Sequence, residues 1–348
     1  MTATQSAVVG AGSALVAALG LWLLLRSRRK EQQPTRWRRA GQLSEILLYP
    51  LKSGRGLALQ QAECTELGLQ VVGPGSSNLR DRFFVIFGEK HGDHKNLKTY
   101  PAMGFITLSA DEEETVLFQA PGMPDLRINI PLIASLNNQK QCLLWKDDRV
   151  GTVDCGEEAA RWASRYVLNK DSGLRLGFYL MPVVERRSVE FKAWAEFRTF
   201  YKKLRTQDLG AYSDLASYML LTESSVKDLD SRLDERSRGI GCLQFRPNFV
   251  VSGTQPYEDD SWDWIRIGDN AIFRNVKPCV RCTITTLNPE TGIRDPYVEP
   301  FKTMQKYRKV TDPRAKKIDE DAPAMGRYIG LYEPGRVKVG DPIYVGCD

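Results

Sequence analysis

Short hydrophobic runs separated by turn residues occupy most of the chain after residue 42. Each run is five to eleven residues long and is bounded by Gly, Pro, Asp or Asn. Runs of this length and spacing are typical of β-strands, because helices need longer segments with a 3.6-residue repeat. The clearest runs are LSEILLYPLKS (43–53), RFFVIFG (82–88), FITLSA (105–110), TVLFQA (115–120), FVVSG (249–253) and RVKVGDPIYVG (336–346).

Three segments instead place apolar residues three or four positions apart, as in an amphipathic helix. They are GEEAARWASRYVL (156–168), TESSVKDLDSRL (222–233) and EPFKTMQKYRK (299–309). Thr222 or Ser224 is suited to cap the second of these helices. With the strands, they predict a mostly β, α+β fold: a barrel-like body with peripheral helices.

A long connector, residues 185–210, carries aromatic residues at helical spacing with basic residues between them. The aromatic stripe consists of Phe191, Trp194, Phe197 and Tyr201. We interpret it as an amphipathic helix packed on the body. The alternative is a basic, aromatic lid near a site or a membrane surface.

The first forty residues follow a different pattern. No charged residue occurs from Met1 to Leu25, and the apolar run 7–25 approaches the ~20 residues that span a bilayer core as a helix. A cluster of Arg and Lys follows this run, and positive flanks stay on the cytoplasmic side. The pattern predicts a signal-anchor with the body facing the cytosol; a cleaved targeting peptide is the alternative.

Charge and glycine spacing exclude two classes of function. Residues 1–40 hold seven of the 49 basic residues and one of the 43 acidic residues, so the body is neutral and no nucleic-acid partner is expected. Gly10 and Gly12 begin like a dinucleotide fingerprint, but Leu15 stands at the third glycine position. No convincing nicotinamide or flavin fingerprint occurs elsewhere.

The segment VKPCVRCTI (276–284) contains the only close pair among seven cysteines, Cys279 and Cys282. The pair can be half of a zinc site, a redox dithiol, a single activated thiolate or two buried side chains. Zinc needs further ligands, and the two histidines, His91 and His94, lie in a Gly-marked loop that we interpret as solvated. A dithiol prefers a helix N-terminus, whereas both flanks of this pair look strand-like. For a thiolate, Lys277, Arg281 and Arg274 would favour the deprotonated form.

Basic residues elsewhere suggest an anion. Lys52 and Ser53 lie at a Gly-rich turn in YPLKSGRG, and Arg82 begins a strand in NLRDRFF. Arg246 enters an apolar strand in FRPNFVV, where an unpaired charge would be costly. Arg246 therefore requires an acidic side chain or an anionic ligand.

The order of YPLKS, ECTELGL, NLRDRF, FRPN, PCVRC, PETG and VGDPIY resembles that of the MOSC-domain molybdenum enzymes, in particular the mitochondrial amidoxime reducing components. The resemblance runs from about residue 42 to the C-terminus. It implies a signal-anchor helix with a basic flank in residues 1–40, a β-rich MOSC N-terminal region in residues 41–184 and a MOSC domain with a β-barrel in residues 185–348.

The same resemblance implies a molybdenum–molybdopterin cofactor. The metal ligand and catalytic residue would be Cys282, with Cys279 a bystander. Residues assigned to cofactor binding are Lys52, Ser53, Arg82, Leu215, Ala216, Arg246, Val280, Arg281 and Tyr328. Leu215 and Ala216 replace a familiar Thr-Ser pair, and Val280 replaces a Ser, so these three could contribute only backbone groups.

The implied reaction is the reduction of small N-hydroxylated compounds such as amidoximes and hydroxylamines. Electrons would come from cytochrome b5 and its NADH-dependent reductase. The implied location is the mitochondrial outer membrane, with the body facing the cytosol. The alternative from another class is a molybdenum-cofactor or sulfur carrier without reductase turnover.

Overall fold

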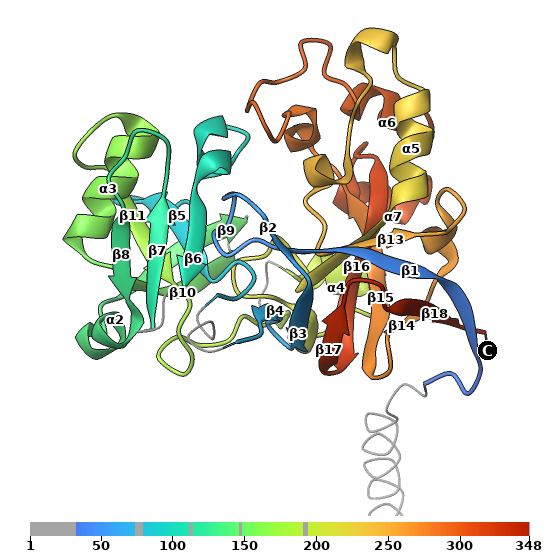
Figure 1. Ribbon diagram of the computed structural model, residues 1–348, viewed down its shortest axis with the longest axis horizontal. Coiled ribbons are helices and arrows are strands. Elements are labelled where there is room, and N and C mark those ends of the chain that lie inside the picture. The colour runs from blue at the N-terminus through green and yellow to red at the C-terminus, as the bar shows by residue number, and fades with distance from the viewer. Residues whose placement is uncertain (1–32, 74–78, 111–113, 146–147, 191–193, 348) are drawn as a thin grey trace, which may run out of the picture. The chain divides into compact units, whose positions relative to one another are not determined.

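A computed structural model describes residues 33–73, 79–110, 114–145, 148–190 and 194–347 (Figure 1). Residues 38–345 form one compact unit. Most of the segment predicted as a signal-anchor lies outside the described residues. Within the described ranges, no helix is both long and apolar enough to cross a membrane.

Seven strands of the larger sheet close into a barrel, which confirms the expected barrel architecture. Their order is β13, β12, β16, β15, β14, β18 and β1, and β1 pairs again with β13 to close the ring. The pairing of β12 with β13 is parallel. The barrel strands are β1 (Trp37–Leu48), β12 (Tyr218–Thr222), β13 (Phe249–Ser252), β14 (Trp264–Ile267), β15 (Ala271–Val280), β16 (Ala324–Glu333) and β18 (Pro342–Gly346).

Alternation along the strands fills the barrel with apolar side chains. On β1, Ile46 and Leu48 are buried in a cluster with residues of β12, β13 and β15. The rings of Tyr218, Phe249 and Phe273 touch one another inside this cluster, with centroids 5.1–5.6 Å apart. A period of two residues therefore gives each barrel strand one core face and one outer face.

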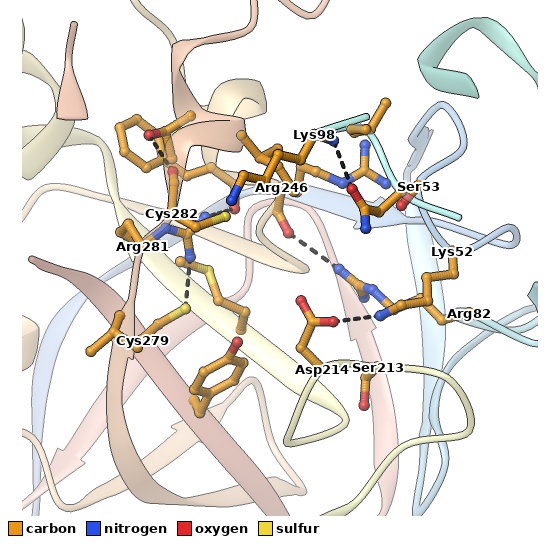
Figure 2. A pocket seen from close by; sticks show the side chains of 18 of the residues that line it. Lys52, Ser53, Arg82, Lys98, Ser213, Asp214, Arg246, Cys279, Arg281 and Cys282 are labelled. Atoms are coloured by element: carbon orange, nitrogen blue, oxygen red, sulfur yellow. Dashed lines mark hydrogen bonds and ion pairs between the residues drawn. The ribbon is translucent and has the colours of Figure 1, made fainter. Parts of the chain in front are cut away.

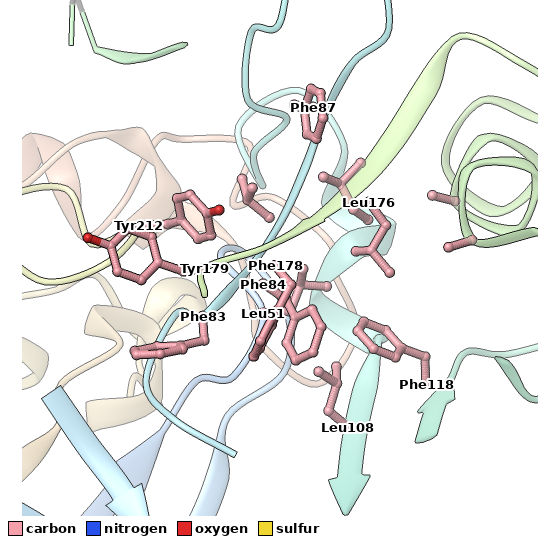
Figure 3. Packing of buried hydrophobic residues seen from close by; sticks show 14 of the residues in the cluster. Leu51, Phe83, Phe84, Phe87, Leu108, Phe118, Leu176, Phe178, Tyr179 and Tyr212 are labelled. Carbon is pink, nitrogen blue, oxygen red and sulfur yellow. The ribbon is translucent and has the colours of Figure 1, made fainter. Parts of the chain in front are cut away.

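The region before residue 180 has its own sheets and its own core. A four-stranded sheet has the order β5, β11, β10, β9, and a three-stranded sheet has the order β6, β7, β8. Their strands are β5 (Phe84–Gly88), β6 (Thr107–Ala110), β7 (Thr115–Gln119), β8 (Leu126–Asn129), β9 (Gln139–Trp145), β10 (Asp148–Asp154) and β11 (Leu174–Phe178). Figure 3 shows the aromatic centre of this core, where Phe84 contacts Phe118 and Phe178.

Short strands complete the β-structure. Strand β2 (Leu57–Leu59) extends the barrel sheet beyond β1. A further three-stranded sheet has the order β17, β3, β4. Its strands are β3 (Gln61–Thr65), β4 (Gly68–Val71) and β17 (Gly335–Lys338).

The three helices predicted from spacing are all present: α3 (Glu157–Leu168), α5 (Glu223–Ser231) and α6 (Phe301–Tyr307). Thr222 is the N-cap position of α5, but its side chain makes no capping hydrogen bond. Two short helices were not predicted, α2 (Ile130–Leu136) and α7 (Pro313–Asp319). Asn129 and Asp312 cap them, each with Pro within the first two helical positions, so the sequence did carry a start signal.

The aromatic connector is less helical than predicted. Among the described residues of the connector, α4 (Ala195–Phe200) is the one α-helix, Thr206–Asp208 forms a 3-10 turn, and Phe191 lies outside the described residues. Trp194, Phe197 and Tyr201 are buried together with Val276 of β15, so this part of the connector packs on the body as expected.

Candidate functional site

Residues from both halves of the folded body line one cavity of about 260 Å³, called here the main cavity. Figure 2 shows the thiol group of Cys282 on one side of it and the side chains of Lys52 and Arg82 on the other. Of the ten residues singled out in the sequence, nine line this cavity: Lys52, Ser53, Arg82, Ala216, Arg246, Val280, Arg281, Cys282 and Tyr328. Leu215 does not. It is buried against Trp194 and Val276 instead, and its assignment to cofactor binding stays a prediction.

The two cysteines of VKPCVRCTI have different surroundings. Cys279 lies in β15, is 1% exposed and accepts a hydrogen bond from Nη1 of Arg281 at 2.6 Å. Cys282 follows the end of β15, begins a single 3-10 turn (Thr283–Thr286) and is exposed. That turn was expected to be a strand. A thiol that is open to the cavity can bind a ligand, whereas the sulfur of Cys279 is already engaged.

Lys277, expected from the sequence to favour the deprotonated form of a cysteine thiol, is instead paired with a carboxylate. Its ammonium group donates to Oδ1 of Asp319 at 2.7 Å, and both side chains are 1% exposed. The ammonium also lies 4.6 Å from the ring centroid of Tyr201. Since Lys277 does not line the main cavity, and Arg274 pairs with Asp263, Arg281 is the cation of this segment that faces the cavity.

Acidic side chains hold Lys52 and Arg82 in the opposite wall. Lys52 is buried, and its ammonium donates to the carbonyl of Tyr212 at 2.9 Å and to the carboxylate of Asp214. The charge of Lys52 holds the pKa of Asp214 well below its usual range. Arg82 donates to the carboxylate of Asp81. Burial by itself lowers the pKa of Arg82, but the charge and hydrogen bond of Asp81, together with Tyr49 and Asp214, raise the pKa overall, so the guanidinium stays charged.

Arg246 differs from its neighbours because it makes no ion pair with any described residue. Its Nη2 donates to the carbonyl of Gly54 at 2.8 Å, and its guanidinium lies 4.2 Å from the ring centroid of Tyr49. Burial lowers the pKa of Arg246 to about 10, and the charge of Arg82 contributes to that shift. Of the two partners that the sequence allowed, an acidic side chain is absent among the described residues, and the charge faces a cavity that the alternative, an anionic ligand, can enter.

Backbone conformation also marks this cavity. Ser53, Arg82 and Arg246 have φ values of 68°, 55° and 53°, in the left-handed region that side chains rarely adopt. All three line the main cavity. Strained backbone clusters where the surrounding structure must place a side chain for function.

Several lining residues were missed by reading the sequence. They include His94, Asn96, Lys98, Asp214 and Asn248. His94, interpreted above as solvated, has Nδ1 3.2 Å from the carbonyl of Leu143, and burial lowers the pKa of its ring. His94, Asn96 and Lys98 lie in one short segment that turns at residues 97–99, so no strand or helix periodicity in the sequence marked them.

The arrangement combines a soft ligand with an anion-binding wall. A thiolate selects soft or redox-active metals, and guanidinium groups bind phosphate through paired N–H donors. Within the described part of the chain, no group of three or more His, Cys, Asp or Glu side chains could hold a metal ion. The cavity therefore suits a ligand that has a thiophilic centre at one end and an anionic group at the other.

Comparisons with known proteins agree with the motif order. A model described as the MOSC N-terminal beta barrel domain matches residues 40–170, and one described as the MOSC domain matches residues 210–344. Mitochondrial amidoxime-reducing component 1 of Mus musculus is 34% identical, over 98% of this chain and 93% of the relative. Mitochondrial amidoxime reducing component 2 of Bos taurus is 33% identical, over 91% of this chain and 87% of the relative.

The likeness to solved structures is weaker. The crystal structure of the YUAD protein from Bacillus subtilis aligns with 89% of this chain and 98% of that chain, at 10% identity and a TM-score of 0.34. A TM-score this low does not support a conclusion about the fold of this chain.

Proposed function

We propose a function from one premise: the chain belongs to the MOSC-domain family of mitochondrial amidoxime-reducing components. We infer that it is a molybdenum-cofactor reductase that acts on small N-hydroxylated compounds, including amidoximes and hydroxylamines. The names of the relatives support the reaction class, and the main cavity supports the cofactor.

The single observation that carries the cofactor assignment is Arg246. The guanidinium of Arg246 has no ionic partner among the described residues, whereas the neighbouring Lys52 and Arg82 are each paired with a carboxylate. The phosphate of molybdopterin fits as the counter-ion of Arg246. At the other side, Cys282 offers an exposed thiol as the protein ligand of the metal. The side chains present therefore fit the group that the family implies.

In this proposal the cofactor, when bound, supplies the two-electron chemistry that converts N–OH to N–H with two protons and releases water. The chain's own residues bind and orient. Cys282 would hold the metal, while Arg281 stays fixed by Cys279 and by the carbonyl of Phe245. Burial, reinforced by Cys279, raises the pKa of Tyr328, so its hydroxyl remains a hydrogen-bond donor at the cavity wall.

We further propose that electrons come from cytochrome b5 and its NADH-dependent reductase, at the mitochondrial outer membrane. Support comes from the relatives' printed mitochondrial names and from the uncharged run that precedes the basic cluster in residues 1–40. Deleting residues 1–32, which ends before β1, should leave a folded protein that keeps its cofactor but couples less well to membrane-bound donors, because tethering raises their effective concentration. Protection of the body from protease in intact organelles would contradict the cytosolic orientation.

The central test separates the two cysteines. In protein loaded with cofactor, Cys282→Ala should abolish reduction of benzamidoxime and remove the metal–thiolate signature from the X-ray absorption spectrum. Cys279→Ala is the matched control and should retain measurable turnover, since its sulfur contacts Arg281 rather than the metal. Equal loss in both variants, or zinc in place of molybdenum in purified protein, would refute the assignment.

A further inference from the structure

A second cavity of about 200 Å³ adjoins the main cavity. The two share four lining residues: Leu97, Gln244, Arg246 and Ile284. Ile284 lies two residues after Cys282, so the second cavity borders the segment that carries the exposed thiol. Ligand pockets commonly measure roughly 300–1,000 Å³, and a pterin cofactor would occupy most of the main cavity. Any additional ligand needs the neighbouring space.

Strand β1 supplies one wall of this second cavity. Glu45, Leu47 and Tyr49 line it, at alternate positions along the chain. The intervening residues, Ile46 and Leu48, are buried in the barrel core. The period of two residues thus turns the outer face of a barrel strand into a binding surface that carries a carboxylate, an aliphatic group and a phenol.

The rest of the lining is largely apolar and contributed by separate segments. It includes Ala58, Leu97, Phe105, Leu243 and Ile284. Gly56 has a steric reason to be glycine, since a Cβ there would lie 2.7 Å from Cε1 of Tyr49. The tyrosine ring is therefore held between Gly56 and the guanidinium of Arg246. A slot of this composition suits a flat, apolar group such as an aromatic ring.

Two polar groups of this wall have no partner among the described residues. Tyr49 is 2% exposed, yet its hydroxyl makes no hydrogen bond. Burial raises the pKa of Tyr49 to about 12, so the group remains a phenol that can donate. The half-buried Glu45 makes no ion pair or hydrogen bond, and burial together with the charge of Glu223 raises its pKa. The half-buried carboxylate of Glu45 lines the cavity and can take a cationic partner from a ligand, whereas the Tyr49 hydroxyl has no accessible surface through which a ligand could reach it.

We propose that the second cavity binds the body of the N-hydroxylated substrate, with Glu45 selecting aromatic compounds that carry a positively charged substituent. This inference rests on the proposed reductase function. The aromatic ring lies along Leu47 and Tyr49, the charged substituent pairs with Glu45, and the N-hydroxyl group extends past Ile284 toward Cys282. Arg246, shared by both cavities, separates the substrate body from the anionic part of the cofactor.

Steady-state kinetics of the full-length, cofactor-loaded protein test this with two compounds, benzamidoxime and 4-(aminomethyl)benzamidoxime. The second adds a cationic ammonium group to the same ring. We expect a lower KM for the charged compound in the wild type. Glu45→Gln should raise that KM about tenfold, the effect of losing one charge-assisted hydrogen bond. The KM of benzamidoxime, which lacks the ammonium group, should rise much less than the KM of the charged compound.

The matched control is Glu158→Gln. It removes the carboxylate of an exposed residue on α3, which lines neither cavity. It should leave both KM values and the molybdenum content at wild-type levels. Equal KM values for the two compounds in the wild type, or a Glu45→Gln effect no larger than that of Glu158→Gln, overturns the proposal.

A binding measurement separates this inference from the reductase function. Isothermal titration with 4-(aminomethyl)benzamidine, which lacks the N–O bond, reports occupancy of the cavity without turnover. Saturable binding that Glu45→Gln weakens supports the second cavity even if neither benzamidoxime is reduced, in which case the proposed reductase function is wrong. Absence of binding to the wild type, or equal binding to both variants, overturns the cavity assignment while leaving benzamidoxime reduction to judge the function.

Discussion

Two arginine sites in this chain differ in whether a carboxylate of the protein pairs with the buried charge. Arg187, which is 3% exposed, pairs with Oδ2 of Asp148 at 2.6 Å and donates to the carbonyl of Ser213 at 2.8 Å. Arg246, at the main cavity, has one carbonyl and one aromatic ring but no carboxylate. The charge of Arg187 is balanced by a carboxylate of the protein, although Nε of Arg187 and Oδ1 of Asp148 make no hydrogen bond. The charge of Arg246 has no carboxylate partner among the described residues.

The difference teaches where to look for function. Breaking a complete buried pair leaves an orphan charge and costs stability. Removing a charge that was never paired inside the protein costs little stability but weakens the binding of its ligand. Stability and ligand content, measured side by side, therefore separate structural charges from functional ones.

The largest expected loss of stability comes from Arg187→Ala. The change leaves the Asp148 carboxylate buried without its partner, so the free energy of unfolding should fall by ~3–5 kcal/mol. Urea unfolding of the protein without cofactor measures this. The double variant with Asp148→Asn should recover part of the loss. A decrease below ~1 kcal/mol would mean that this buried pair stabilises the protein no more than an exposed ion pair does.

Asp259 is a buried acidic group that, like Arg246, has no ion pair among the described residues. Burial, and then the charge of Asp260, raises its pKa from 3.8 to about 6. Between pH 4 and pH 6 the folded protein keeps this proton while the unfolded chain loses it, so stability falls as pH rises, by up to ~2–3 kcal/mol.

Asp259→Asn should therefore flatten that part of the pH profile and raise the free energy of unfolding at pH 7 by ~1–2 kcal/mol. Urea unfolding at pH 4.5 and pH 7 measures both effects. Asp269→Asn, at an exposed turn, is the control and should keep the wild-type slope. An unchanged slope in Asp259→Asn would show that the carboxyl is ionised in the folded state throughout this range.

Arg246→Ala should change the stability of the cofactor-free protein by less than ~1 kcal/mol, since no carboxylate loses its partner. Molybdenum per protein should fall at least tenfold. Arg246→Lys should recover only part of it, because lysine lacks the planar fork that suits phosphate. Metal analysis with melting temperatures of the apo and loaded forms decides. Full occupancy in both variants would remove Arg246 from the cofactor site.

The smallest effect is expected at the surface. Lys227 pairs with Glu223 one turn earlier in α5, at 3.4 Å, and its side chain is 79% exposed. Lys227→Ala should change the free energy of unfolding by less than ~0.5 kcal/mol, because solvent screens such pairs. Urea unfolding again measures it. A loss comparable to that of Arg187→Ala would show that exposure does not distinguish these charges.

Hydrophobic alternation, a local signal, anticipated the barrel, and the family resemblance of short motifs anticipated nine of the residues that line the main cavity. Arg246 stood out because a cation within an apolar run demands a partner. The partners of the other charges could not be inferred in this way. Asp214 contacts Lys52 from 162 positions away, and Asp319 meets Lys277 only after α7 packs on the connector.

The orientation of Leu215 and the exposure of Cys282 were also beyond sequence patterns. Leu215 lies in the loop before β12, where its orientation follows from packing with Trp194 and Val276, and Cys282 lies at the start of the 3-10 turn after β15. The residues alone could identify the pair of cysteines, and the family resemblance singled out Cys282, but the contact of Cys279 with Arg281 could be seen only in the fold.

The main cavity joins residues from Lys52 to Tyr328, and β16, which carries Tyr328, also bridges β12 and β15 in the barrel. A chain arrested before β16 can neither close the barrel nor complete the cavity. Under the proposed function, the cofactor could therefore bind only after the whole chain has folded. Because a ligand that binds only the native state stabilises it by mass action, cells short of the cofactor should accumulate less of this protein through faster proteolysis of the apo form.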